Sequence, residues 1–182
     1  KEHGKAEWIY LLRGRVLPDF DARELGLSSQ LAIKAISKAS GASSDIVAKE
    51  FNKIGDLGEV AEKILEKKKQ ATLFSSHLTI DKVFDNFYKI LSIEGKGAVD
   101  KKLNLIIELL NSSTGKEAKY IIRTLLGDLR VGVADSTLRD GIAEAFFFED
   151  KKEMSAKIED VYDMVNDFAV VFDAAIKGKK EL

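Results

Sequence analysis

Two short turns in this sequence combine glycine with a basic residue, and an amphipathic segment follows each of them. The first reads EGKGA at residues 94–98, and the second reads RVGVA at residues 130–134. Glycine allows positive φ angles and lets the backbone come close to a ligand, and a helix that follows offers unpaired N–H groups and a positive dipole end. Both turns are therefore candidate anion-binding sites.

Two such turns on one helical body could hold two phosphates of a nucleic-acid backbone. The side chains that would add positive charge there are Lys96, Lys101, Lys102 and Arg130. A second interpretation stays open, because glycine is also the usual residue just after a helix, where it only ends that helix. Spacing alone does not decide between a phosphate site and a cap.

The charge balance limits how the chain could bind nucleic acid. It has 182 residues and a formal net charge of -1, so any nucleic-acid surface must be a local patch. Residues 95–139 hold eight Lys and Arg against five Asp and Glu, but residues 94 and 140 just outside are both acidic. With 45% hydrophobic residues, the length suffices for one sizeable core or for two small helical lobes.

Cysteine and histidine usage excludes several kinds of site. The chain has no cysteine, which excludes disulfides and thiolate-bound metals. Its two histidines, His3 and His77, stand far apart in the sequence, so we expect no histidine metal cluster. No apolar run approaches the roughly 20 residues that span a membrane, and the first residues are polar. We therefore expect a cytoplasmic protein that has no membrane partner.

The apolar spacing predicts an all-α fold built of helical hairpins, because segment after segment repeats at three and four residues and none alternates as a strand would. Serine or threonine precedes several segments as an N-cap, and Thr114 with Glu117 predicts a capping box. Asp135 or Ser136 is expected to cap the helix after the second turn. The similar turns imply an internal pseudo-two-fold repeat. The predicted helices cover about residues 6–13, 29–40, 44–54, 60–69, 80–91, 98–111, 115–126, 136–146 and 155–177.

Three motifs together resemble one family. They are GDLGEVA at residues 55–61, GKG at residues 95–97 with two lysines after it, and LGDLRVGVA at residues 126–134. In order and spacing they are similar to the N-terminal DNA-binding domain of archaeal and eukaryotic ATP-dependent DNA ligases, with the archaeal branch most similar. The resemblance extends from about Trp8 to the end. It implies an all-helical body with pseudo-symmetry that grips duplex DNA around a nick, mainly through the backbone across the minor groove.

The resemblance also implies which residues bind DNA. They are Gly95, Lys96, Gly97, Ala98, Lys101, Lys102, Arg130 and Gly132. It further implies that residues 1–178 form the DNA-binding domain without its first helices, and that residues 179–182 begin a linker to an adenylylation domain. The parent enzyme would act in DNA replication, repair and recombination, and this chain would be a monomer.

One departure from the family pattern bears on catalysis. A DNA ligase takes up AMP on the lysine of a Lys-x-Asp-Gly motif, but the nearest string here, LRDG at residues 138–141, has Leu138 in place of that lysine. We therefore expect no catalytic residue in this chain, no ligation by it alone and no cofactor bound to it. ATP and Mg²⁺ are expected only in the absent catalytic domains.

A further segment, QATLF at residues 70–74, is similar to the short glutamine-plus-aromatic box with which archaeal ligases bind the sliding clamp PCNA. Its candidate clamp-binding residues are Gln70, Leu73 and Phe74, although Leu73 stands where an aromatic residue is common. The alternative is an ordinary loop whose apolar side chains pack on their own domain. A competing hypothesis for the whole chain is a helical protein-interaction module that docks a clamp or a partner domain.

Overall fold

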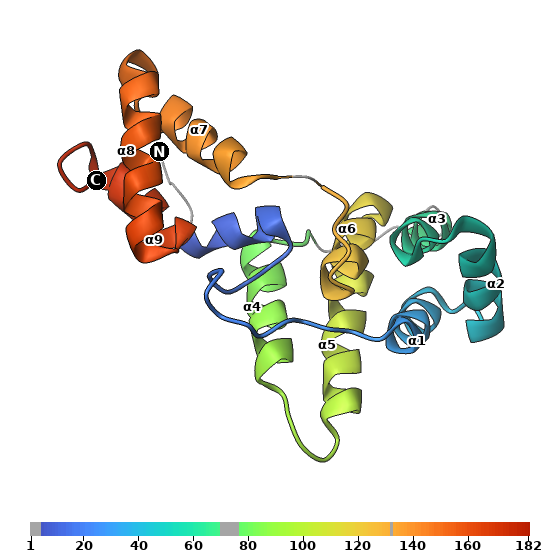
Figure 1. Ribbon diagram of the computed structural model, residues 1–182. Coiled ribbons are helices and arrows are strands. Elements are labelled where there is room, and N and C mark those ends of the chain that lie inside the picture. Colours follow the sequence, from blue (N-terminus) through green and yellow to red (C-terminus); the bar gives the residue numbers. More distant parts are fainter. Residues whose placement is uncertain (1–4, 70–76, 132) are drawn as a thin grey trace. The chain divides into compact units, whose positions relative to one another are not determined.

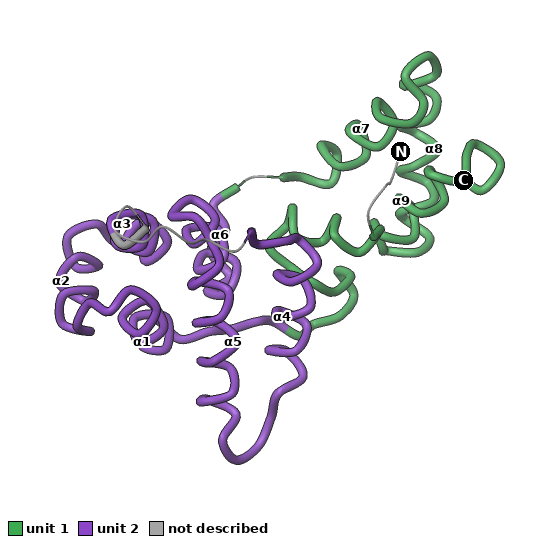
Figure 2. Tube along the Cα trace, turned by 180° about the vertical axis from the view of Figure 1, so that it is seen from behind, with its two compact units in different colours: residues 1–23, 131–182 green, residues 24–130 purple. Residues whose placement is uncertain are grey.

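The computed structural model describes residues 5–69, 77–131 and 133–182 (Figure 1). Over these residues the chain is helical and contains no strand, which confirms the predicted all-α class. The backbone forms two compact units (Figure 2). Unit 1 joins Lys1–Arg23 to Val131–Leu182, and unit 2 is Glu24–Arg130. The chain thus folds as two units, one of them built from both ends of the sequence.

The described residues of unit 2 form a bundle of six α-helices. Its helices are α1 (Ser29–Ser40), α2 (Ser44–Ile54), α3 (Leu57–Lys69), α4 (Ile80–Ser92), α5 (Ala98–Ser112) and α6 (Gly115–Leu125). The predicted apolar faces form its core. Large side chains that are fully buried there include Val47, Phe87, Ile90, Leu103, Ile106, Leu109, Leu110, Ile122 and Leu125.

Local hydrogen bonds explain where several of these helices begin. Ser43 accepts a hydrogen bond at the start of α2, and Thr79 accepts one from the Lys82 N–H at the start of α4. The predicted capping box is present at α6. Thr114 Oγ1 accepts from the Glu117 N–H at 3.1 Å, and the Glu117 carboxylate accepts from the Thr114 N–H at 2.6 Å.

Helices α3 and α6 approach each other closely because each has a glycine at the contact. A Cβ atom on Gly58 of α3 would lie 2.7 Å from the Cγ of Arg123 and 2.8 Å from the Lys119 carbonyl oxygen. A Cβ atom on Gly115 of α6 would lie 2.9 Å from the Glu62 carbonyl oxygen. Larger residues at either position would push the two helices apart.

Unit 1 packs the start of the chain against its end. It consists of the 3₁₀ helix η1 (Ala6–Arg13), α7 (Asp135–Phe146), the short η2 (Phe148–Asp150), α8 (Lys151–Val165) and α9 (Phe168–Lys177). Its core contains Ile9, Leu138, Ile142, Met154, Ile158, Phe168 and Val171. Tyr10 donates a hydrogen bond to Asp167 at 2.7 Å, which ties η1 to the start of α9.

The structure corrects two predicted elements of unit 1. The single helix expected at residues 155–177 is two helices, α8 and α9, because Asn166 adopts φ 54° and Asp167 then caps α9 by accepting from the Ala169 N–H at 2.8 Å. Asparagine tolerates the left-handed conformation better than most residues do. The predicted cap of α7 is also wrong. Asp135 is the first residue of that helix, and no side chain caps it.

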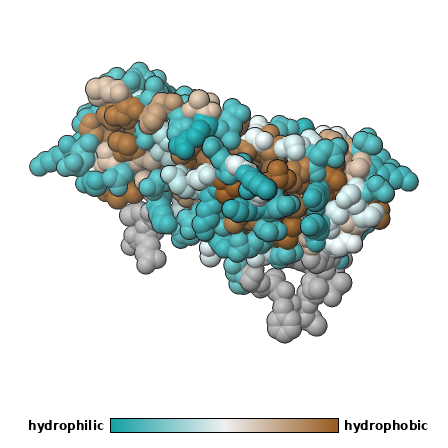
Figure 3. All heavy atoms as spheres, turned by 90° about the horizontal axis from the view of Figure 1, so that it is seen from below, coloured by the Kyte–Doolittle hydropathy of each residue, from teal (hydrophilic) through white to brown (hydrophobic). Residues whose placement is uncertain are grey.

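The surface is mostly hydrophilic on the face shown in Figure 3, with hydrophobic patches between the polar side chains. The most exposed large apolar side chains of the described residues are Phe20, Phe148 and Met164. None of the described helices has the length and hydropathy that crossing a membrane requires.

Candidate nucleic-acid interface

The first glycine turn joins α4 to α5 inside unit 2. Gly95 and Gly97 both have φ 79°, a conformation that residues with a side chain rarely adopt. Gly97 is the N-cap residue of α5, so no side chain accepts a hydrogen bond from the first N–H groups of this helix. Lys96 and both glycines are exposed, and Ala98 is half-buried. The turn therefore presents an uncapped helix N-terminus on an exposed segment.

Three lysines surround this N-terminus. Lys96 and Lys101 are exposed and Lys102 is half-buried. Within the described parts of the chain, none of the three forms an ion pair with a carboxylate. Glu94 and Asp100 lie in the same segment, so residues 94–102 carry three positive and two negative charges. The lysine ammonium groups are thus available to an anionic ligand.

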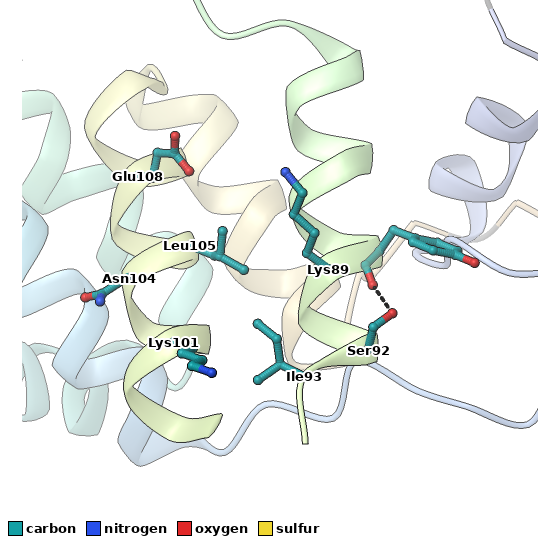
Figure 4. Close-up of a pocket in the computed structure, with 8 residues that line it drawn as sticks. Lys89, Ser92, Ile93, Lys101, Asn104, Leu105 and Glu108 are labelled. Atoms are coloured by element: carbon teal, nitrogen blue, oxygen red, sulfur yellow. Dashed lines mark hydrogen bonds between the residues drawn. The ribbon is translucent and has the colours of Figure 1, made fainter. Parts of the chain in front are cut away.

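An open groove of about 840 Å³ lies between α4 and α5 near this turn, and Figure 4 shows its walls. Lys101 is one of the residues that line it, so the groove continues from the candidate phosphate site. The full lining is Tyr88, Lys89, Ser92, Ile93, Lys101, Asn104, Leu105 and Glu108. The sequence did not predict this groove, because it depends on how two separate helices pair.

The one carboxylate in the groove lining is already neutralised. Lys82 lies 2.6 Å from one oxygen of Glu108, and Asn86 donates a hydrogen bond to the other oxygen at 3.0 Å. The hydrogen bond from Lys82 and that from Asn86 lower the pKa of Glu108 below its usual value. Because Lys82 pairs with Glu108, the two lysines of the lining, Lys89 and Lys101, give the groove a net positive charge.

The segment that leads into the second glycine turn begins where α6 ends. Gly127 has φ 71°, its N–H donates to the Thr124 carbonyl oxygen at 3.1 Å, and the Asp128 N–H donates to the Arg123 carbonyl oxygen at 2.9 Å. These two bonds are the Schellman arrangement that ends many helices. Gly127, which precedes the turn at residues 130–134, is thus a helix-ending residue.

Arg130 lies three residues further on and differs from the lysines of the first turn. Its φ is 55°, and its side chain is 46% exposed. Its guanidinium pairs with two carboxylates. Arg130 Nη1 lies 3.0 Å from Asp56 Oδ2, and Arg130 Nε donates to Asp128 Oδ2 at 2.8 Å. The positive charge of this turn is therefore held in place by neighbours.

Asp56 comes from the GDLGEVA motif and is the centre of this network. Its side chain is only 5% exposed, and Arg123 reaches it with Nη2 at 2.6 Å and Nε at 3.1 Å. The Glu59 N–H donates to it at 3.1 Å, which caps α3. Burial alone would raise the pKa of Asp56, but these hydrogen bonds and the charges of Arg123 and Arg130 outweigh burial and lower it.

The rest of the second turn leads into the other unit. Val131 is exposed, Gly132 lies outside the described residues, and Ala134 precedes α7, whose N-terminus no side chain caps. The passage from unit 2 to unit 1 falls between Arg130 and Val131. The two turns thus differ in structural setting, and the pseudo-two-fold repeat stays a prediction.

The LRDG string belongs to α7, where Leu138 is buried in the core of unit 1, and Arg139 pairs with Glu159 at 2.7 Å. Gln70, Leu73 and Phe74 of the clamp-binding box lie outside the described residues. Among the described residues, no group of three or more His, Asp or Glu side chains is arranged to hold a metal ion.

The chain is similar in sequence to known DNA ligases. The family model described as DNA ligase N terminus matches residues 2–143. A DNA ligase of Thermococcus fumicolans is 42% identical over 174 residues, which cover 95% of this chain and 30% of the relative. A DNA ligase of Nitrosopumilus maritimus is 39% identical over 175 residues, covering 96% of this chain and 29% of the relative. The chain spans less than a third of the length of these relatives.

Proposed function

Because the chain belongs to the DNA ligase N-terminus family, we propose that it binds duplex DNA through backbone phosphates, without sequence preference, and positions a nick for ligation. The chemistry of ATP-dependent ligation, with ATP and Mg²⁺, would take place in other domains of the parent enzyme. In this proposal residues 1–178 are the DNA-binding domain, and residues 179–182 lead towards an adenylylation domain. The minor groove is the face of the duplex that the domain would cover.

The observation that carries the proposal is the first turn. An uncapped helix N-terminus and three lysines without carboxylate partners meet on one exposed segment of the described structure. Backbone N–H groups at a helix start and mobile ammonium groups are both suited to phosphate oxygens. Neither reads base edges, so the resulting binding is independent of sequence.

The proposed contacts fall into two kinds. Gly95 and Gly97 would present backbone N–H groups to one phosphate, with Lys96, Lys101 and Lys102 supplying charge around it. Ala98 would lie at the same site as the first residue of α5, and its own N–H donates to the Gly95 carbonyl oxygen at 3.1 Å, which holds the turn in shape. Arg130 and Gly132 would make the corresponding contacts at the second turn. A chain with a net charge of -1 gains no attraction from its overall charge, so the interaction must come from these local groups.

Fluorescence anisotropy with a short labelled duplex tests the proposal directly. The chain would be titrated against a nicked duplex, its intact counterpart and a second intact duplex of unrelated sequence, each at several salt concentrations. We expect salt-sensitive binding of all three, with equal affinity for the two intact sequences. The absence of binding at low salt would contradict the proposal. A clear preference between the two intact sequences would contradict the backbone mode.

A second proposed function concerns the sliding clamp PCNA. Its support is the QATLF box at residues 70–74 in the segment between α3 and α4. Replacing Leu73 and Phe74 with alanine should abolish clamp binding in a calorimetric titration and leave duplex binding intact. Unchanged clamp binding by that variant would refute the assignment, and the Gln70→Ala variant gives an independent check of the same box.

A further inference from the structure

The GDLG motif at residues 55–58 takes no part in the DNA contacts proposed above, yet its carboxylate reaches one of them. Asp56 Oδ2 lies 3.0 Å from Arg130 Nη1, although 73 positions separate the two residues in the sequence. At 5% exposure, Asp56 is too deeply buried to touch DNA itself. An influence of Asp56 on DNA binding would therefore act through a residue that it holds, and Arg130, at 46% exposure, is the more exposed of its two arginine partners.

Asp56 is itself held rigidly. Arg123 binds it through two nitrogen atoms, and the Glu59 N–H binds it from the first turn of α3. The side chain of Arg123 is only 11% exposed. Gly58 makes this arrangement possible, because a Cβ atom there would lie 2.7 Å from Arg123 Cγ and 3.0 Å from Asp56 Oδ1. Arg130 is thus anchored to a fixed point in the core of unit 2.

The anchored guanidinium retains donors for a ligand. An arginine side chain carries five N–H bonds. Asp128 accepts from Nε, and Asp56 lies against Nη1. The Nη2 group makes no hydrogen bond to the protein among the described residues. With 46% of the side chain exposed, these remaining donors can reach a phosphate from an orientation that is already set.

We infer that Asp56 is a positioning residue for DNA binding, which fixes the guanidinium of Arg130 so that its free N–H groups face a backbone phosphate. This inference rests on the proposed function, since it assigns a role to Asp56 only if Arg130 contacts DNA. Anchoring removes side-chain freedom before the ligand arrives, so binding loses less entropy. Losing the anchor should weaken binding by about two- to tenfold.

The direction in which Asp56→Asn changes the affinity for DNA distinguishes a positioning role of Asp56 from an effect of its charge alone. Asp56→Asn removes a negative charge from the protein, and charge alone would then make a polyanion bind more tightly. Positioning predicts the opposite, weaker binding. Glu50→Gln is a matched control, because Glu50 is a carboxylate of the same unit that pairs with Lys63 and Lys53 and not with Arg130.

A double-mutant cycle tests the inference. Duplex affinity would be measured for the wild-type chain, Asp56→Asn, Arg130→Ala and the double variant, with circular dichroism as the check of folding. We expect Asp56→Asn to weaken binding about two- to tenfold when Arg130 is present and to have no effect when it is absent. Glu50→Gln should not weaken binding. Equal weakening in both backgrounds, or tighter binding by Asp56→Asn, would overturn the inference and leave the proposed function standing.

If Arg130→Ala binds as the wild type does, Arg130 is not a DNA contact, and both the inference and the second-turn part of the proposed function fail. If Asp56→Asn does not fold, Asp128→Asn replaces it, because the Asp128 side chain is 54% exposed and holds the same guanidinium at Nε. Weaker binding by Asp128→Asn only in the presence of Arg130 supports the anchored guanidinium, and tighter binding contradicts it.

Discussion

The two glycine turns share a sequence pattern, but their basic side chains differ in whether carboxylates pair with them. In the first turn, Lys96 and Lys101 are exposed and have no carboxylate partner in the described structure. In the second, Arg130 is held by Asp56 and Asp128. A mobile ammonium group adapts to a ligand, whereas an anchored guanidinium is set in advance. The same motif in a sequence can therefore supply either kind of charge, depending on what packs against it.

The largest expected difference between the turns is in how much a substitution near each of them changes the free energy of unfolding. Arg123→Ala would leave the Asp56 carboxylate buried without its main partner, which should lower the free energy of unfolding by about 3–5 kcal/mol. Lys101→Ala removes an exposed side chain and should change it by less than about 0.5 kcal/mol. Urea unfolding followed by circular dichroism measures both. Similar midpoints for the two variants would show that the second turn is not anchored as described.

Gly97 of the first turn and Gly127, just before the second, should respond alike to substitution. Gly97→Ala and Gly127→Ala each place a side chain at φ above 70°, and each should cost about 1 kcal/mol of unfolding free energy. Gly141→Ala is the matched control, because Gly141 lies within α7 with no atom near its Cβ position. That substitution should stabilise the protein by up to about 1 kcal/mol, as alanine does in helices. If Gly127→Ala were neutral, the Schellman ending of α6 would not require glycine.

The smallest expected effect is on the stability of the protein at acid pH. The pKa of Asp56 is lowered in the folded chain, so its contribution to stability is fully present above its ordinary value of 3.8 and is lost as the pH falls through the folded value. As the pH falls below about 4, the wild type should therefore lose more unfolding free energy than Asp56→Asn does. Denaturant titrations at several pH values measure this. Equal losses would show that Asp56 is not linked to acid unfolding.

Local sequence signals predicted most of the fold. Serine or threonine caps precede helices as expected, at Ser43, one of two serines that could cap α2, and at Thr79, and the capping box is present at Thr114. Each of these features depends on residues within one helical turn. The break at Asn166 was missed, because the apolar stripe continues across it and a single residue in the left-handed conformation decides the outcome. Periodicity alone cannot detect such a break.

The candidate site was less predictable than the fold. The sequence identified Lys96, Lys101 and Arg130 as basic residues in or just after the glycine turns. It did not predict that Asp56 pairs with Arg130, because this pairing depends on the packing of α3 against α6. The groove between α4 and α5 was missed for the same reason. Contacts between residues distant in the sequence are set by packing, and the spacing of one segment does not contain them.

The salt dependence of duplex binding tests the central claim most directly. Each phosphate contact contributes about one unit to the slope of log affinity against log salt concentration, so Lys101→Ala with Lys102→Ala should reduce the slope by about two. Lys34→Ala with Lys38→Ala removes the same charge from exposed positions on α1 and should leave the slope unchanged. A wild-type slope in the Lys101 and Lys102 double variant, or an equal reduction in the control, would contradict phosphate binding at the first turn.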